Sequence, residues 1–329
     1  MGLPRPLLRV LRSTPVLNCV SAVSSVHPRV LMWHRFGPET TARAVGVDLF
    51  DAQMALLRAR FELVSASELC RARSEGRLRR NMVAVTIDDG YEDFFHFALP
   101  VLRKHRIPAT LYATTEFVDQ RLWLWPDYLR YAIEHTSRNS IECDRGGEAL
   151  SIDLRTPSAR ERAWHTLADH ALTLTTSEAQ RFIRTVVGEL KTSVPDTPTE
   201  PFRALTWAQL REVAKAGVEI GGHTCTHPLL TNCTETQIAK EVEVSKQELE
   251  NQLQVSVTSI AYPHGICDET VRRLVKQAGY QNAYSGTATD YRIHDAFDIK
   301  RCGGGDDMVS FRNAAYGVHF AAGQCGIQI

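Results

Sequence analysis

Short apolar runs alternate with segments of helical periodicity along most of the chain. The apolar runs are bounded by Gly, Pro or charged residues, which predicts short buried strands. These predicted strands cover residues 30–34, 61–64, 83–87, 109–113, 218–220 and 259–262. Apolar residues at helical spacing predict helices over residues 50–60, 92–105, 206–216, 234–253 and 268–278. Strands that alternate with helices through short links indicate a parallel α/β sheet or barrel.

Local signals refine the helix boundaries. Two capping boxes, Thr206–Gln209 and Thr234–Gln237, mark the starts of helices. Ser67 is a candidate cap for a further helix that runs through Cys70. Pro100 lies inside a predicted helix and must break or kink it, because proline donates no N–H.

Residues 119–200 interrupt the strand–helix rhythm. This segment is polar and helical in pattern, and it closes with a stretch rich in Pro and Thr. We interpret it as an insertion or lid within one domain that spans residues 29–329, not as a separate enzyme. Residues 1–28 are predicted to be weakly structured.

Composition limits the class of protein. The chain has 329 residues, and its hydrophobic content of 43% is sufficient for a full core. Lys and Arg number 38, as do Asp and Glu, so the charge favours no nucleic acid or anionic membrane partner. No stretch reaches the 18 apolar residues that a membrane-spanning helix needs.

The eight cysteines and the N-terminus bear on the cell compartment. The cysteines are scattered, with no C-x-x-C pair, and a chain of this length needs no disulfide framework. We therefore expect reduced thiols and a cytoplasmic location. Arg5, Arg9 and Arg12 with nearby Ser faintly suggest a transit peptide, but a frayed cytoplasmic N-terminus is the favoured interpretation.

Two adjacent carboxylates, Asp88 and Asp89, end the buried strand at residues 83–87, and Gly90 then turns the chain. Buried carboxylates are costly unless something neutralises their charge, and a bound metal ion would do so. The alternative is a simple turn, because Asp-Gly is a common turn pair.

His223 and His227 follow the predicted strand at residues 218–220, with two glycines before them and Pro228 after them. This context favours a tight loop that aims both imidazoles at one point. Two His and one carboxylate leave an open position on Zn²⁺ for water, and the same set suits Fe, Co or Ni. Two unrelated surface histidines are the alternative for this stretch alone.

The two stretches together are more specific than either one. Each follows a strand, so both fall on the same rim of a parallel sheet. One carboxylate then suffices as a metal ligand, and the other is free to act as a base.

These motifs resemble those of a known family. Thr86–Gly90 and His223–Pro228 resemble the first two signature motifs of the polysaccharide deacetylases, also called carbohydrate esterase family four. Ala261–Gly265 is similar to the third motif of the branch that deacetylates exopolysaccharide. The resemblance covers residues 30–120 and 200–320 approximately, and it implies an incomplete, distorted (β/α)7 barrel, here with a helical insertion.

The resemblance also implies roles for single residues. Asp88 would be the general base, and the backbone N–H of Tyr91 would help to hold the oxyanion. Asp89, His223 and His227 would bind a divalent metal, for which Zn²⁺ is the first choice and Co²⁺, Ni²⁺ or Fe²⁺ are alternatives.

The third motif is expected to line the acetyl pocket. Tyr262, Pro263 and Gly265 are therefore predicted to contact substrate. Aromatic residues near the rim are candidates for stacking on sugar rings, and these are Trp33, Trp123, Trp125 and Tyr262.

The chain departs from the family pattern in two places. Many members have an Arg at the start of the third motif, where it steadies the base, but this chain has Ala261. Arg301, near the C-terminus, is predicted to replace this Arg and is also counted among the substrate-binding residues. The catalytic acid is assigned to His34, as in a permuted branch, because the late candidate His319 has a poorly matching context.

The predicted function is metal-dependent removal of N-acetyl groups from an N-acetylated sugar or polysaccharide. One alternative is a hydrolase of another C–N bond, such as a sugar formamide. A second alternative is a non-catalytic carbohydrate-binding barrel. The sequence does not indicate the oligomeric state.

Overall fold

The computed structural model describes residues 25–41, 43–144, 149–286 and 291–318. These residues contain a nine-stranded sheet built from parallel strand pairs. Its main path runs through β12 (Ile299–Lys300), β11 (Asn282–Ser285), β10 (Ser259–Ala261), β9 (Glu219–Gly222), β6 (Ala109–Ala113), β5 (Met82–Ile87), β1 (Arg29–Trp33) and β13 (Cys302–Gly303). The short strand β4 (Glu62–Val64) pairs with the first half of β5, beside this path.

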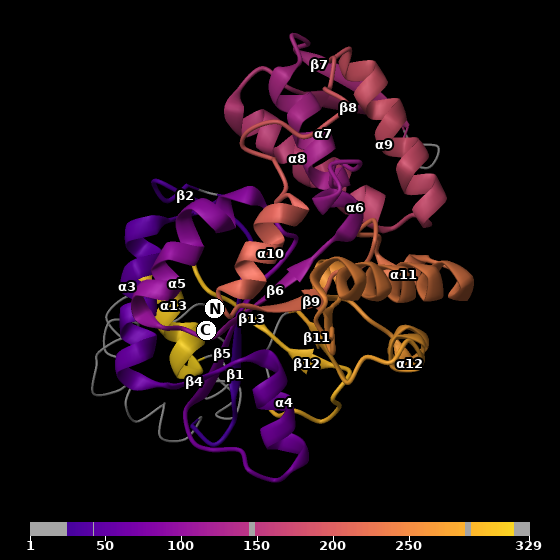
Figure 1. The fold of residues 1–329 in the computed structure, drawn as a ribbon. Coiled ribbons are helices and arrows are strands. Elements are labelled where there is room, and N and C mark those ends of the chain that lie inside the picture. The colour runs from indigo at the N-terminus through magenta and orange to yellow at the C-terminus, as the bar shows by residue number, and fades with distance from the viewer. Residues whose placement is uncertain (1–24, 42, 145–148, 287–290, 319–329) are drawn as a thin grey trace.

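The sheet curls into a nearly closed barrel with helices around it (Figure 1). The two ends of the path, β12 and β13, are consecutive in the chain and are separated only by Arg301. Within five residues the chain therefore pairs first with β11, through β12, and then with β1, through β13. The barrel has an unsealed seam between β12 and β13. This architecture confirms the predicted α/β class and the incomplete, distorted barrel.

Strands with continuous apolar runs were predictable, whereas polar ones were not. All residues of β5 and β6 are buried, as expected for parallel strands that are covered on both faces. β11 had no sequence signal, because it begins with Asn282 and ends with Ser285, which are polar although both are buried. β12 and β13 are too short for a periodic pattern.

Seven helices accompany the barrel strands. They are α3 (Val47–Arg60), α4 (Ala66–Ser74), α5 (Leu99–His105), α10 (Trp207–Lys215), α11 (Glu235–Leu253), α12 (Glu269–Gln277) and α13 (Met308–Tyr316), counted within the described ranges. Short elements fill the links: β2 (Phe36–Gly37) pairs with β3 (Val45–Gly46), and single helical turns form η2 (Leu230–Asn232) and η3 (Pro263–Gly265).

The local helix signals are confirmed with one correction. Both capping boxes, at Thr206 and Thr234, are present. The predicted cap Ser67 is wrong: Ser65 caps α4 by accepting a hydrogen bond from the Glu68 N–H, and the Ser67 hydroxyl donates to Glu219 instead. The helix with Pro100 is interrupted as predicted, because a π-helical turn, η1 (Phe94–Ala98), comes before α5.

The inserted segment forms a lobe on one side of the barrel (Figure 1). It contains α6 (Thr115–Val118) at its entry, then α7 (Trp125–His135), β7 (Ser140–Asp144), β8 (Ala149–Asp153), α8 (Pro157–Leu172) and α9 (Thr176–Leu190). Side chains from α7, α8, α9 and the β7–β8 hairpin form a hydrophobic cluster of their own. The antiparallel β7–β8 hairpin was not predicted from the sequence.

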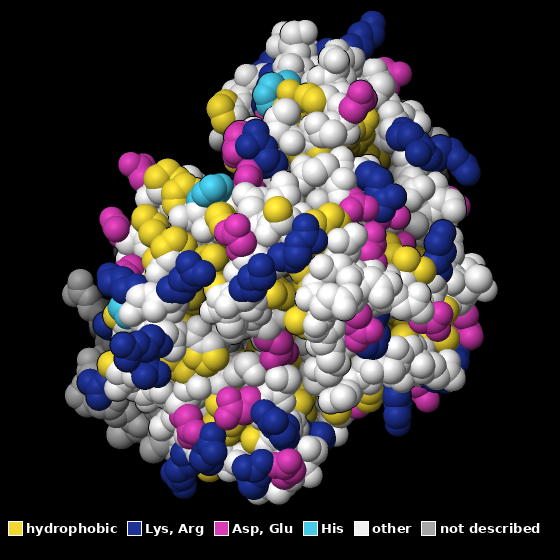
Figure 2. Space-filling model, in the orientation of Figure 1, with side chains coloured by type: hydrophobic (Ala, Val, Ile, Leu, Met, Phe, Trp, Pro, Cys, Tyr) yellow, Lys and Arg dark blue, Asp and Glu magenta, His cyan; other side chains and the backbone are white. Residues whose placement is uncertain are grey.

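The surface in Figure 2 carries basic and acidic side chains interspersed, in line with the balanced composition. In the described ranges, no helix combines the length and the apolar character that a bilayer crossing requires. The segment 1–28, predicted to be weakly structured, lies outside the described residues except for its last four positions, and so does His319.

Candidate metal and catalytic site

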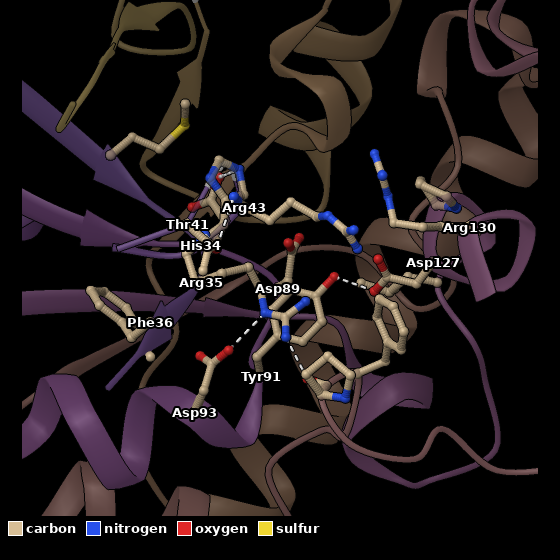
Figure 3. Close-up of a pocket in the computed structure, with 18 of the residues that line it drawn as sticks. His34, Arg35, Phe36, Thr41, Arg43, Asp89, Tyr91, Asp93, Asp127 and Arg130 are labelled. Atoms are coloured by element: carbon tan, nitrogen blue, oxygen red, sulfur yellow. Dashed lines mark hydrogen bonds and ion pairs between the residues drawn. The ribbon is translucent and has the colours of Figure 1, made fainter. Parts of the chain in front are cut away.

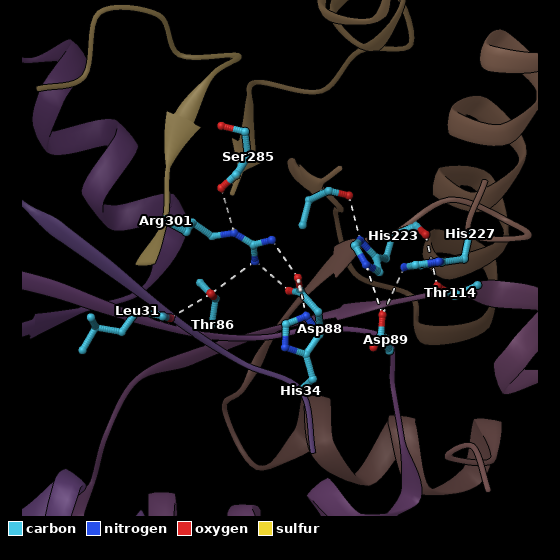
Figure 4. Close-up of polar contacts among 11 residues, drawn as sticks. Leu31, His34, Thr86, Asp88, Asp89, Thr114, His223, His227, Ser285 and Arg301 are labelled. Carbon is cyan, nitrogen blue, oxygen red and sulfur yellow. Dashed lines mark hydrogen bonds and ion pairs between the residues drawn. The ribbon is translucent and has the colours of Figure 1, made fainter. Parts of the chain in front are cut away.

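The first motif places two carboxylates at the end of β5. The Asp88 N–H donates to the carbonyl of Trp33 in the neighbouring strand β1, at 3.0 Å. Asp89 and Gly90 then adopt left-handed backbone angles, with φ of 74° and 93°. This sharp turn sends the two neighbouring carboxylates to different partners (Figure 4).

Asp89, His223 and His227 converge on one point. The Asp89 Oδ1 atom lies 3.2 Å from His223 Nε2 and 3.3 Å from His227 Nε2. All three side chains are buried, and their ligand atoms lie within 4.8 Å of one another. The three residues that the sequence suggested as metal ligands are therefore together.

The donor set fits a divalent cation. The His223 Nδ1 atom lies 2.8 Å from the carbonyl of Ala261, so this nitrogen carries the proton and the Nε2 lone pair faces Asp89. The Asp89 Oδ1 atom is buried and has no hydrogen-bond donor among the described residues. Burial alone would raise the pKa of Asp89, but the adjacent imidazoles of His223 and His227 hold that pKa well below its ordinary value. An ionised carboxylate with two histidines is a usual zinc ligand set.

The loop that carries the two histidines is held by Glu241 of α11. The Glu241 carboxylate accepts hydrogen bonds from the N–H groups of Cys225 and Thr226, at 2.8 and 2.9 Å, and from the Thr226 hydroxyl at 2.6 Å. The Cys225 thiol donates to the Glu241 carbonyl, so it points away from the cluster. The expected tight loop is therefore held in place by hydrogen bonds to α11 between its two histidines.

Asp88 has a separate partner, Arg301. The two guanidinium nitrogens Nη1 and Nη2 lie 2.6 and 2.7 Å from the two carboxylate oxygens of Asp88 (Figure 4). Both side chains are buried. Burial raises the pKa of Asp88, but the charge of Arg301 outweighs it and keeps that pKa below its ordinary value. Asp88 is thus held ionised and oriented by the residue that occupies the barrel seam.

The predicted acid His34 follows β1 and lies beside this pair. Its Nε2 atom is 3.9 Å from Asp88 Oδ2, and 45% of its side chain is exposed. A bound substrate can therefore reach the imidazole from the open side of the site.

These residues line one cavity of about 1330 Å³. Asp88, Asp89, His34, His223 and His227 form one part of its wall, and the inserted lobe contributes Trp164 to another part. Asp127 and Arg130 of the same lobe also line the cavity (Figure 3). The wall also includes Tyr91, whose backbone N–H donates to no carbonyl in the described part of the chain. A free N–H at the cavity is what the oxyanion role requires.

The predicted substrate contacts are only partly in the cavity wall. Tyr262, Gly265 and Arg301 line it, and Pro263 is buried beside them. Trp33 requires a correction: its indole packs edge-on against Phe50 in the core, and its N–H donates to Gln53 at 3.2 Å. Trp33 belongs to a β-strand whose alternate side chains face opposite sides, so it faces the surrounding helices and not the cavity.

Several cavity residues escaped the sequence analysis. The Arg35 guanidinium lies 4.0 Å from the Tyr91 ring centroid and pairs with Asp93 at 2.7 Å. Burial raises the pKa values of Asp93 and Asp127 to about 6. Their signals were weak, because Asp127 reads as an ordinary acidic residue in the first turn of a helix and Arg35 as a polar residue after a strand.

His264 is a further missed residue, inside the third motif. Its ring centroid lies 4.9 Å from that of His227 and 5.7 Å from that of Trp125, which comes from the insertion. Burial, together with the nearby His227, lowers the pKa of His264 to about 3, so this imidazole is neutral.

Several residues of the site have left-handed backbone angles. Of the nine non-glycine residues with positive φ in the described ranges, four are Asp89 (74°), Thr224 (67°), His227 (59°) and His264 (59°). Such angles cost about 1–3 kcal/mol each and persist where the surroundings hold them, often at functional sites.

A sequence model of one family, described as polysaccharide deacetylase, matches residues 75–283, which is more than half of the chain. The chain belongs to the polysaccharide deacetylase family. The chain is 34% identical over 77 residues to YxkH of Bacillus subtilis strain 168, whose name places it in the same family. That match spans 23% of the present chain and only 28% of YxkH.

Solved structures of deacetylases share the fold of this chain. Streptococcus pyogenes deacetylase PplD, in complex with acetate, matches with a TM-score of 0.55 and 20% identity over 85% of this chain and 92% of PplD. IcaB from Ammonifex degensii matches with a TM-score of 0.56 and 17% identity over 90% of this chain and 97% of IcaB. At these identities the likeness supports the barrel architecture.

Proposed function

We propose that this member of the polysaccharide deacetylase family is a metal-dependent hydrolase that removes N-acetyl groups from an N-acetylated sugar or polysaccharide. One observation carries the proposal. The buried group Asp89, His223 and His227 lies beside a second carboxylate, Asp88, that is paired with Arg301 and is therefore not needed as a ligand. Both face a cavity that is open to solvent.

Asp89, His223 and His227 would hold the cation, with Zn²⁺ as the first choice and Co²⁺, Ni²⁺ or Fe²⁺ as alternatives. When bound, a divalent cation polarises the amide carbonyl and lowers the pKa of water. The protein itself supplies the ionised Asp89 and a histidine whose tautomer is set by Ala261.

The remaining residues supply the proton transfers. Asp88, held ionised by Arg301, accepts a proton from the attacking water. His34, whose Nε2 atom lies 3.9 Å from Asp88 Oδ2 in the cavity wall, donates a proton to the departing amine. The Tyr91 N–H donates a hydrogen bond to the oxygen that becomes negative in the tetrahedral state.

The substrate in this proposal is an N-acetylated carbohydrate. Aromatic and polar residues of the insertion and the third motif, including Trp164, Tyr262 and His264, line the cavity where a sugar would lie. We also propose a cytoplasmic location, which is supported by free thiols at Cys70, Cys225 and Cys267.

Metal analysis together with product analysis tests this function. The purified protein should bind one divalent ion per chain and release acetate from N-acetylated glycans. His227→Gln should weaken metal affinity by more than about 100-fold, because it removes a ligand outright. His96→Ala, which changes an exposed histidine outside the cavity wall, is the matched control and should bind metal normally.

Two results would redirect the proposal. Release of formate in place of acetate would favour the sugar formamide alternative. Binding of chitooligosaccharide by the metal-loaded protein without any acetate release would favour a non-catalytic barrel.

Replacement of His34 tests the acid. His34→Ala should lower kcat by about 10²–10³-fold for a sugar acetamide, because the amine leaves poorly without a proton. An activated acetate ester, whose leaving group needs no proton, should be affected much less. The comparison is made by kcat measurements on both substrates. Equal rates for His34→Ala and the wild type, with a loss in His319→Ala, would move the acid to His319.

A further inference from the structure

The inserted lobe contributes a carboxylate to the catalytic cavity. Asp127 lies in the first turn of α7, in the same cavity wall as Asp88 and Asp89. Its Oδ2 atom accepts a hydrogen bond from the Tyr91 hydroxyl at 2.5 Å (Figure 3). Tyr91 is only two residues from Asp89, so this contact ties the insertion directly to the first catalytic motif.

The Tyr91 ring is held on its other sides as well. The Arg35 guanidinium, from the segment after β1, lies 4.0 Å from the ring centroid. Phe117 of α6 packs edge-on against the ring, with centroids 5.2 Å apart. Asp127 is the polar contact that fixes the far end of the side chain.

The main chain of Tyr91 is fixed by the segment that follows the insertion. Leu205 donates its N–H to the Gly90 carbonyl at 2.9 Å, and Glu92 donates its N–H to the Arg203 carbonyl at 2.9 Å. The N–H of Tyr91 itself donates to no backbone carbonyl among the described residues, and Tyr91 is part of the cavity wall. Contacts from both ends of the insertion therefore surround the one backbone donor that the proposed reaction needs.

We propose that Asp127 is a positioning residue through which the insertion holds the Tyr91 N–H in the direction of the reacting carbonyl. This inference rests on the proposed deacetylation. An N–H that donates to the oxygen on which negative charge develops stabilises the transition state most when its direction is fixed before the reaction. If the hydrogen bond from the Tyr91 hydroxyl to Asp127 is removed, the ring can rotate, and the backbone N–H of Tyr91 can change its direction.

A double-mutant cycle tests the proposal through acetate release by the metal-loaded full chain. Asp127→Ala should lower kcat by about 10- to 100-fold with little change in KM. This loss is smaller than the roughly 10²–10³-fold loss of kcat expected when an oxyanion donor is removed completely, because the N–H is still present. Tyr91→Phe, which keeps the N–H and loses the hydroxyl, should give a similar loss. The double variant should be no worse than either single one, because both changes break the same contact.

Two further variants sharpen the cycle. Asp127→Asn should regain most of the activity, because its amide oxygen still accepts the Tyr91 O–H. Asp153→Asn, which changes an exposed acid of the same insertion, should behave like the wild type. Additive losses, or an increase in KM alone, would show that Asp127 contacts substrate directly and would overturn the proposal.

A readout without turnover separates this inference from the proposed function. In protein labelled with ¹⁵N-tyrosine, nine amide signals are expected, and Tyr91→Phe identifies the signal of Tyr91 by its loss. That signal should shift in Asp127→Ala and return in Asp127→Asn. An unchanged signal would overturn the positioning role even in an active enzyme. Absence of acetate release from the wild type would instead contradict the proposed function.

Discussion

Asp88→Asn should abolish acetate release and leave metal binding intact. The amide of Asn cannot accept the proton of the attacking water, and general-base catalysis is worth about 10²–10⁴-fold. Asp88 is not in the group of residues that can share a metal ion, because both of its oxygens face Arg301. We therefore expect a loss of kcat of at least about 10³-fold with unchanged metal content, measured on the same preparations.

The neighbouring residue supplies the matched comparison. Asp89→Asn removes a metal ligand, so metal content and activity should fall together. Asp88→Asn with normal rates would disprove the assignment of the base. Loss of metal in Asp88→Asn would show that both carboxylates are ligands.

Arg301→Met should give the largest loss of stability among these variants. Methionine has a similar length but no charge, so Asp88 is left buried without its partner. Breaking a buried ion pair in this way costs about 3–5 kcal/mol. The expected result is a free energy of unfolding that is lower by that amount, measured by denaturant titration.

Arg273→Met is the control for charge removal. Arg273 pairs with Glu235, and both side chains are largely exposed, so its loss should change the free energy of unfolding by less than about 1 kcal/mol. Equal effects of the two substitutions would contradict a buried Asp88–Arg301 pair.

The same variant should also change the pH dependence of activity. Arg301 keeps the pKa of Asp88 below its ordinary value, and burial alone would raise that pKa. The base must be ionised, so activity falls as pH decreases through its pKa. In Arg301→Met the acid limb of the kcat/KM profile should therefore move to higher pH. An unmoved limb would mean that Arg301 acts only on stability.

Local patterns were sufficient for much of the site. Asp88 and Asp89 end a continuous apolar strand, and His223 and His227 follow another strand after two glycines. In parallel strands these ends meet at one rim, so the meeting of the motifs follows from their positions. The roles of these residues stay predictions until variants are measured.

Other features had no local pattern to reveal them. β11 begins and ends with buried polar residues, Asn282 and Ser285, and the β7–β8 hairpin lies within a segment that reads as helical. Trp33 was predicted to contact substrate as an aromatic residue near the rim, but successive residues of a strand point to opposite faces. Sequence distance of one residue therefore says little about which side of a strand a side chain occupies.

The sequence by itself determined the family motifs, the parallel α/β class and the ligand types, because these depend on residues that are close in the chain. Only the tertiary structure decided which residues serve those motifs from far away. Arg301 reaches Asp88 across 213 positions because the barrel closes at its seam, and Asp127 reaches Tyr91 because the insertion folds back over the cavity. Such contacts depend on where whole elements pack, and no short-range periodicity encodes that.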